Sequence, residues 1–165
     1  MSSSALQARP VRESRSEYTD VTLPIDANTA GNVLGGHIMH LIDLCGGIAA
    51  HRHARRPVVT ASVDQVSFLS PVRVGQLLML KSSVNRVFHS SMEVGVKVWV
   101  EDVNTGNVRH TSSAYLTFVA LDETGTPVAV QPVLPESGEE KRRYEEAGGR
   151  RELRLLARRK PGSLP

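Results

Sequence analysis

The strongest pattern along the chain is a run of hydrophobic residues that recurs at the spacing of an α-helix. Ile38, Leu41, Ile42, Cys45 and Ile48 follow one another at intervals that place them on one helix face. Other apolar residues cover the opposite side, and a helix that is apolar nearly all round belongs in a protein interior. The sequence therefore predicts one long buried helix over residues 38–50, closed by a polar cluster and a proline at residues 51–57.

Further segments carry the alternation or the β-branched composition of strands. In residues 91–100, Met92, Val94 and Val96 alternate with polar or small neighbours, which is the pattern of a strand with one buried face. The other segments are residues 16–23, 58–68, 76–88 and 108–121, and turn-forming residues separate the later ones. The order β-α-β-β-β-β predicts an α+β fold in which a curved antiparallel β-sheet wraps around the one long central helix.

Length and composition bound the organisation of the chain. With 165 residues, 40% of them hydrophobic and 22% charged, the chain has the size and character of one globular domain. We expect a flexible N-terminal tail at residues 1–15, a folded domain at residues 16–135, and a basic helix and tail at residues 136–165, the helix covering about 136–159.

The first 15 residues lack the apolar stretch of a secretory signal. No run reaches the ~20 apolar residues of a membrane helix, so we expect a cytoplasmic protein without membrane contact.

The positive charge is concentrated in the C-terminal segment. Residues 139–160 contain 9 Lys or Arg and 5 Glu, whereas the rest of the chain is nearly neutral. A basic segment of this kind suits nucleic acid, a solvated helix, or a clamp for a small phosphorylated ligand. We do not expect nucleic acid as a partner, because the charge is mixed with Glu and aromatic residues make up only 4% of the chain.

Asp43 is the exception within the apolar helix. It is flanked by Ile42 and Leu44, and an ionised carboxylate in an apolar setting is costly unless it has partners or a chemical role. As a structural residue it would accept hydrogen bonds from backbone amides or pair with an arginine. As a functional residue it would be a general base or a nucleophile, and we favour this interpretation because a candidate oxyanion site lies nearby.

That candidate site is the pair Gly35 and Gly36 at the start of the helix. The first amides of a helix lack acceptors within it, and they can stabilise negative charge that develops on a carbonyl oxygen. Asp43 lies about two turns, or ~10 Å, further along the axis, so a symmetric dimer would be needed to bring it toward the glycines of another chain. Asn28, in the polar loop before the helix, is either a turn former or a residue that orients a water or a carbonyl.

The remaining reactive side chains show no pattern of a metal site or of another catalytic site. His37 and His40 share a helix face, but no third ligand is spaced with them, so we expect no metal site. Cys45 is the only cysteine, and without an evident base it fits a core position. The sequence contains neither a G-x-S-x-G elbow nor a P-loop.

Several segments, taken together, resemble a known family. Residues 26–43, which read DANTAGNVLGGHIMHLID, match it together with residues 50–53, 59–64, 68–72, 89–94, 133–136 and 140–144. They are similar to the hotdog-fold acyl-CoA thioesterases, in particular the cytosolic acyl-CoA hydrolases and their bacterial single-domain relatives. The likeness covers about residues 17–160, and the hotdog fold that it implies agrees with the sheet and helix predicted above.

The resemblance implies roles for the residues that it matches. Asn28 and Asp43 would be the catalytic pair, and Arg151 would reach a phosphate of CoA. The rest of the CoA molecule would lie along Ala61, Ser62, Val63, Ser90, Ser91 and Met92. Two-domain relatives divide a working pair between their halves, whereas this chain holds both residues. The resemblance therefore implies a homodimer with two interfacial sites, and trimers of such dimers are common in the family.

We therefore expect an enzyme that hydrolyses fatty acyl-CoA to free acid and CoA. Asp43 would act as base or nucleophile, Asn28 would position the water or the thioester, and amides near Gly36 would stabilise the oxyanion. No metal or redox cofactor would be required, since CoA is part of the substrate and the product. Two alternatives stay open: a non-catalytic sensor of acyl-CoA or CoA, and a hotdog hydratase or dehydratase. No histidine stands at the position of Asn28, where the second alternative would place one.

Overall fold

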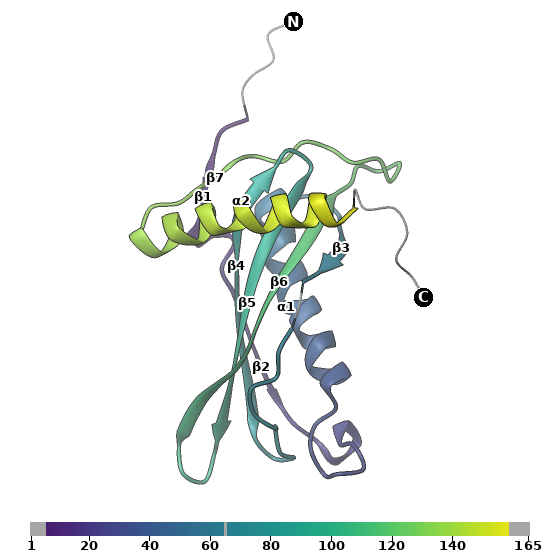
Figure 1. Cartoon of the computed structure of the whole chain (residues 1–165), viewed down its shortest axis with the longest axis vertical. Coiled ribbons are helices and arrows are strands. Elements are labelled where there is room, and N and C mark those ends of the chain that lie inside the picture. The colour runs from purple at the N-terminus through teal and green to yellow at the C-terminus, as the bar shows by residue number, and fades with distance from the viewer. Residues whose placement is uncertain (1–5, 65, 159–165) are drawn as a thin grey trace, which may run out of the picture.

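A curled antiparallel sheet holds one long helix on its inner side and a second helix on its outer side (Figure 1). This computed structural model describes residues 6–64 and 66–158. Its elements are β1 (Arg9–Pro10), η1 (Val11–Glu13), β2 (Ser16–Val21), η2 (Pro24–Asp26), α1 (Gly35–Ala54), β3 (Val58–Val63), β4 (Leu77–Phe88), β5 (Ser91–Asp102), β6 (Asn107–Ala120), β7 (Val133–Leu134) and α2 (Gly138–Arg158). The large sheet has the order β2-β4-β5-β6-β3 with antiparallel neighbours, which confirms the predicted fold class.

Apolar packing holds α1 against the inner face of the sheet. Ile42 on the helix and Val94 and Val98 on β5 are buried, as the helical spacing and the strand alternation predict. The helix also approaches β6 closely, because a Cβ at Gly46 would lie only 3.2 Å from the ring of Phe118. A larger residue at this position would force the helix away from the sheet.

The helix is not buried all round, which corrects the sequence prediction. Leu44 and Ile48 are 43% and 41% exposed, and because they are four residues apart they lie on one side of α1. Met39, also 43% exposed, lies near the start of the helix. The reason is that the sheet curls around only the other side of the helix. The stripe formed by Leu44 and Ile48, called here the open stripe, is therefore uncovered in the single chain.

The segment before β2 also differs from the prediction of a flexible tail. The backbone N–H of Arg9 donates to the carbonyl of Pro132 at 2.9 Å, and β1 pairs in parallel with β7. Val11 is buried, and the hydroxyl of Ser14 accepts a hydrogen bond from the backbone N–H of Val84. Residues 9–14 thus belong to the fold, because backbone groups hold them, and residues 1–5 of the predicted tail lie outside the described residues.

Strand β3 ends at Val63, earlier than predicted, and contains a β-bulge. Thr60 stands opposite Phe118, on the face that packs against α1, whereas Ser62 stands opposite Thr117. Regular alternation would put Thr60 and Ser62 on one face, and the extra residue Ala61 moves them to different faces.

Helix α2 begins with a reciprocal cap. The hydroxyl of Ser137 accepts from the backbone N–H of Glu140, and the Glu140 carboxylate accepts from the N–H groups of Glu136 and Ser137 and from Arg15. Burial would raise the pKa of the Glu140 carboxyl, but these backbone and side-chain donors outweigh it and hold the pKa below its usual value.

The helix extends as predicted to Arg158, and residue 159 lies outside the described residues. No helix in the described part of the chain is long and apolar enough to cross a membrane.

Replacing Glu140 with Gln removes a pH-dependent contribution to stability. Because folding depresses the pKa of this carboxyl, the contribution is present above the pKa of the unfolded chain, about 4.3, and is lost as the pH falls through the folded value. Urea unfolding should show a deficit of about 1 kcal/mol at pH 7 that shrinks toward pH 3. The exposed Glu145→Gln is the control, and a deficit that stayed constant with pH would contradict this account.

Candidate active site

Asn28 is held in a turn that leaves its side-chain nitrogen available. Its Oδ1 accepts hydrogen bonds from the backbone N–H groups of Ala30 and Asn32 at 2.9 and 3.1 Å. With Oδ1 occupied in this way, the Nδ2 group is the side-chain donor that remains, and it bonds to no other residue in the described ranges. The exposed Asn28 can therefore donate a hydrogen bond to a ligand.

His37 ties this loop to the start of α1. Its Nδ1 lies 3.3 Å from a carboxylate oxygen of Asp26, and its Nε2 lies 3.4 Å from one of Asp20 on β2. The backbone N–H of Leu34 also donates to the carbonyl of Asp26 at 2.8 Å. His37 thus contacts two carboxylates that fix the loop, and no group of three His, Cys, Asp or Glu suited to a metal ion occurs in residues 6–64 and 66–158.

The two glycines at the start of α1 differ in their surroundings. A Cβ at Gly35 would lie 3.3 Å from the ring of Phe68, whereas one at Gly36 would meet nothing within 4 Å. Neither backbone N–H donates to another residue that the structure describes. The helix start is therefore accessible at Gly36 and retains free donors, as an oxyanion site requires.

Asp43 has a neutral partner. The hydroxyl of Thr60 donates to Oδ1 of Asp43 at 2.6 Å, across the gap between β3 and α1. Asp43 is half-buried, and within the described residues it neither forms an ion pair nor accepts a backbone hydrogen bond. The described residues thus supply neither of the partners that the structural interpretation requires, and among them no hydrogen bond joins Asp43 to Asn28. No local sequence signal points to Thr60, because its orientation depends on the bulge at Ala61.

A groove of about 230 Å³ brings several of the predicted CoA residues together at the end of the sheet beside α2. It is lined by Ala61, Ser62, Ser91, Thr117, Val119, Arg151, Arg154, Leu155 and Arg158. The Arg151 guanidinium donates to the hydroxyl of Ser91 at 3.1 Å and lies 4.5 Å from the ring centroid of Phe88. The groove thus contains Ala61, Ser62, Ser91 and Arg151 from the predicted set.

The other predicted CoA residues lie outside the groove. Val63 is exposed at the end of the edge strand β3, and Ser90 occupies the turn between β4 and β5. Met92 is a correction: its side chain is fully buried in the core, because the alternation of β5 places it on the α1 face with Val94. It therefore does not line the groove.

The charge of the groove suits an anionic ligand. Arg151, Arg154 and Arg158 follow one another at helical spacing and so share one side of α2. Burial and the nearby charges of Arg154 and Arg158 lower the pKa of the Arg151 guanidinium, as expected where cations gather without an equal number of anions. Two buried polar atoms of groove residues, Nη2 of Arg154 and Oγ1 of Thr117, have no hydrogen-bond partner among the described residues. A phosphate group would supply the missing oxygens.

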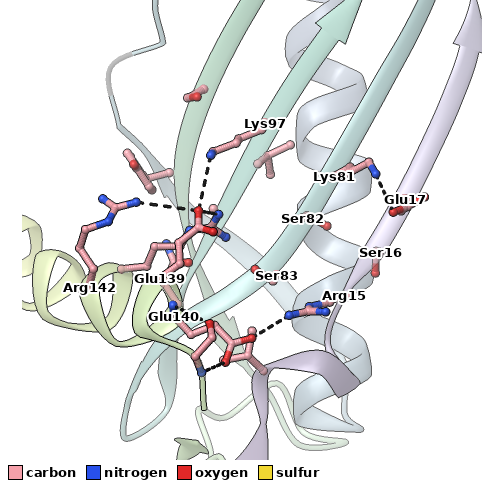
Figure 2. Close-up of a pocket in the computed structure, with 18 of the residues that line it drawn as sticks. Arg15, Ser16, Glu17, Lys81, Ser82, Ser83, Lys97, Glu139, Glu140 and Arg142 are labelled. Carbon is pink, nitrogen blue, oxygen red and sulfur yellow. Dashed lines mark hydrogen bonds and ion pairs between the residues drawn. The ribbon is translucent and has the colours of Figure 1, made fainter. Parts of the chain in front are cut away.

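A larger hollow, of about 470 Å³, lies under the first turns of α2 on the outer face of the sheet (Figure 2). Its charged residues pair with one another: Lys97 lies 3.9 Å from Glu139, and Arg15 lies 2.8 Å from Glu140. Lys81 likewise pairs with Glu17 at 3.1 Å. None of the predicted site residues lines this hollow, so we place the candidate site at the groove and the α1–β3 contact.

Comparison with known proteins identifies the family. Residues 30–107 match the family model of the thioesterase superfamily. An uncharacterised acyl-CoA thioester hydrolase of Bacillus subtilis, YkhA, is 43% identical over 134 residues, which are 81% of this chain and 78% of the relative. The chain belongs to the acyl-CoA thioester hydrolases. The family predicted from the sequence is thereby confirmed.

Solved structures of this family have the same fold. A hexameric acyl-CoA thioesterase superposes with a TM-score of 0.90 at 40% identity, covering 93% of this chain and 99% of the other. The acyl-CoA hydrolase of Staphylococcus aureus, solved with butyryl-CoA, CoA and CoA disulfide, gives a TM-score of 0.86 at 38% identity over 92% of each chain. Variants of that enzyme with alanine in place of an aspartate, an asparagine or a threonine have also been solved. The hotdog fold of this hydrolase is thus confirmed.

Because three arginines line the groove, we expect the hydrolase to bind inorganic triphosphate. Binding to the folded state should raise Tm by about 5 °C at a ligand concentration of ~100 Kd. Arg151→Ala and Arg158→Ala should each reduce this rise, whereas Arg142→Ala, at the other end of α2, should keep it. An equal rise in all three variants would place anion binding elsewhere on the molecule.

Proposed function

We propose that this hydrolase cleaves fatty acyl-CoA to a free acid and CoA, with Asp43 and Asn28 at the reacting carbonyl and the arginine groove at the phosphates of CoA. The proposal rests on strand β3. On one face of this strand Thr60 holds Asp43, and on the other face Ala61 and Ser62 line the groove. Acyl-CoA has a matching layout, because a long pantetheine arm separates its thioester from its phosphates. The S. aureus relative, which binds butyryl-CoA and CoA, supports this class of substrate.

Each side chain has a defined task in the proposed reaction. The Asp43 carboxylate takes a proton from water, which attacks the thioester carbonyl, or it attacks that carbonyl itself. The Nδ2 group of Asn28 orients the water or the thioester. The amide at Gly36 stabilises the oxyanion of the tetrahedral intermediate, which collapses by expelling the CoA thiolate. In the first route the proton taken up by Asp43 then neutralises the thiolate. In the second route water hydrolyses the mixed anhydride between Asp43 and the acyl group, which releases the acid, regenerates Asp43 and supplies the proton for the thiolate. Neither route requires a metal or redox cofactor.

The proposed enzyme is a homodimer. Strand β3 lies at the edge of the sheet, with Val59 and Val63 47% and 42% exposed, and α1 beside it carries the open stripe. An unpaired edge next to an apolar stripe is a surface that a second copy covers well. Asp43 accepts a hydrogen bond from Thr60 of this edge strand, so the partner would approach it. The hexameric relative supports further assembly into a trimer of dimers.

Hydrolysis of butyryl-CoA tests the catalytic pair. In Asp43→Asn and Asn28→Ala, kcat should fall by about 10²-fold or more, because a general base and a positioning donor are removed from the transition state. Glu17→Gln, an exposed carboxylate on β2, should retain wild-type kcat. Wild-type activity in Asp43→Asn would remove this carboxylate from the mechanism.

Mixing the two variants tests whether the pair comes from two chains. If Asn28 of one chain works with Asp43 of its partner, a mixed dimer has one intact site and one doubly altered site. Random pairing should then restore about a quarter of wild-type activity from two nearly inactive proteins. If both residues act within one chain, each site keeps one substitution and the mixture stays inactive. Mixed dimers purified with two different affinity tags make the comparison quantitative.

A further inference from the structure

Glu93 is a fully buried carboxylate at the centre of an ion-pair network beneath α2. It lies on the outer face of β5 and accepts hydrogen bonds from Arg150 at 2.7 to 3.2 Å, from Arg154 at 3.3 Å and from the Asn85 amide at 3.1 Å. Burying a carboxylate costs several kcal/mol unless partners of this kind compensate. Both cations belong to α2, so Glu93 fixes this helix to the sheet.

The network ends at the groove. Arg154 lines the groove and is held between two carboxylates, Glu93 and Asp64, with the Asp64 oxygen at 2.7 Å. Asp64 directly follows β3, the strand that carries Ala61 and Ser62 into the same groove. Arg150, one turn before Arg154, lies 3.7 Å from the ring centroid of Tyr115 on β6. The guanidinium of Arg154 is therefore fixed in direction by two carboxylates, one on β5 and one directly after β3.

The absence of a side chain at Gly95 makes room for Asn85, one of the hydrogen-bond donors to Glu93. A Cβ at Gly95, the next outward-facing residue of β5, would lie only 3.0 Å from Nδ2 of Asn85, the donor to Glu93. Docking α2 on the sheet does not in itself require a buried charge, because apolar residues in such places are often as stabilising as an ion pair. The position of the network beside the groove indicates a role in the direction of its arginines.

We propose that Glu93 is a positioning residue for the phosphates of the substrate, an inference that rests on the proposed acyl-CoA hydrolysis. Glu93 holds Arg154 directly, and through Arg150 it sets α2, so that the arginines of the groove meet the phosphates in a fixed geometry. The direction in which removal of the Glu93 charge changes substrate binding separates this positioning role from a simple effect of charge. As a charge, a carboxylate near the groove repels an anionic ligand; as a positioning residue, it strengthens binding.

Two substrates with the same reacting group test the proposal. Butyryl-CoA and butyryl-pantetheine share the thioester and the pantetheine arm, but only the first has phosphates. In Glu93→Gln, KM for butyryl-CoA should rise about tenfold, the effect of one misdirected charge-assisted hydrogen bond, while kcat stays unchanged. The kcat/KM for butyryl-pantetheine should stay within about twofold of wild type, since that substrate does not use the arginines.

The control is Glu152→Gln, which removes the same charge from the exposed side of α2 close to the groove. It should leave KM for butyryl-CoA unchanged or lower it. A lower or unchanged KM in Glu93→Gln would overturn the positioning role, as would an equal loss with both substrates. If Glu93→Gln fails to fold, Asp64→Asn tests the same hold on Arg154 from a partly exposed carboxylate, and it should show the same selective rise in KM.

Calorimetric titration separates this inference from the function on which it rests. If the wild type hydrolyses neither substrate, the proposed reaction fails. Binding of CoA and of pantetheine to wild type and Glu93→Gln still gives a result in that case. A selective loss of CoA affinity in the variant supports the positioning role, and equal affinities overturn it.

Discussion

The bulge in β3 is the constraint on which the candidate site depends. A regular strand would place Thr60 and Ser62 on one face, and either the hold on Asp43 or the wall of the groove would be lost. The extra residue Ala61 sends Thr60 toward α1 and Ser62 toward α2. One irregular residue in an edge strand therefore serves two helices on opposite faces of the sheet, and it fixes the proposed site for the acyl group relative to the proposed site for the phosphates.

The distribution of charge follows the same division. The first turns of α2 carry basic residues that pair with glutamates near them, as between Arg143 and Glu139. Further along the helix the arginines face the sheet. Glu93 and Asp64 pair with Arg150 and Arg154 there, and the other arginines, Arg151 and Arg158, line the groove. The excess of basic residues near the C-terminus is thus divided between solvated ion pairs and the groove proposed to bind phosphates, so the composition of the segment alone predicts only its net charge.

The sequence predicted the fold well because its main elements have simple periodicities. The alternation around Val94 and the apolar run through Ile42 required the sheet and the helix that the structure contains. The same alternation places Met92 inside the core, as the structure shows. The family resemblance, which implied a contact with CoA, did not take this alternation into account. Thr60 and Arg154 could not be predicted, because their roles depend on a bulge and on contacts between distant segments. The segment around Arg9 was missed because backbone hydrogen bonds, which composition does not reveal, hold it in place.

Asp43 and Glu93 show why one acidic residue of this fold suits catalysis and the other does not. Glu93 is surrounded by Arg150, Arg154 and Asn85, so its oxygens are committed to cations and its charge is compensated. Both oxygens of that carboxylate accept hydrogen bonds from these partners, so its value lies in direction and rigidity. Among the residues that the structure describes, Asp43 has one partner, the neutral hydroxyl of Thr60, which fixes one oxygen and leaves the second available. The choice of partner, a cation or a hydroxyl, therefore separates a structural anchor from a candidate base.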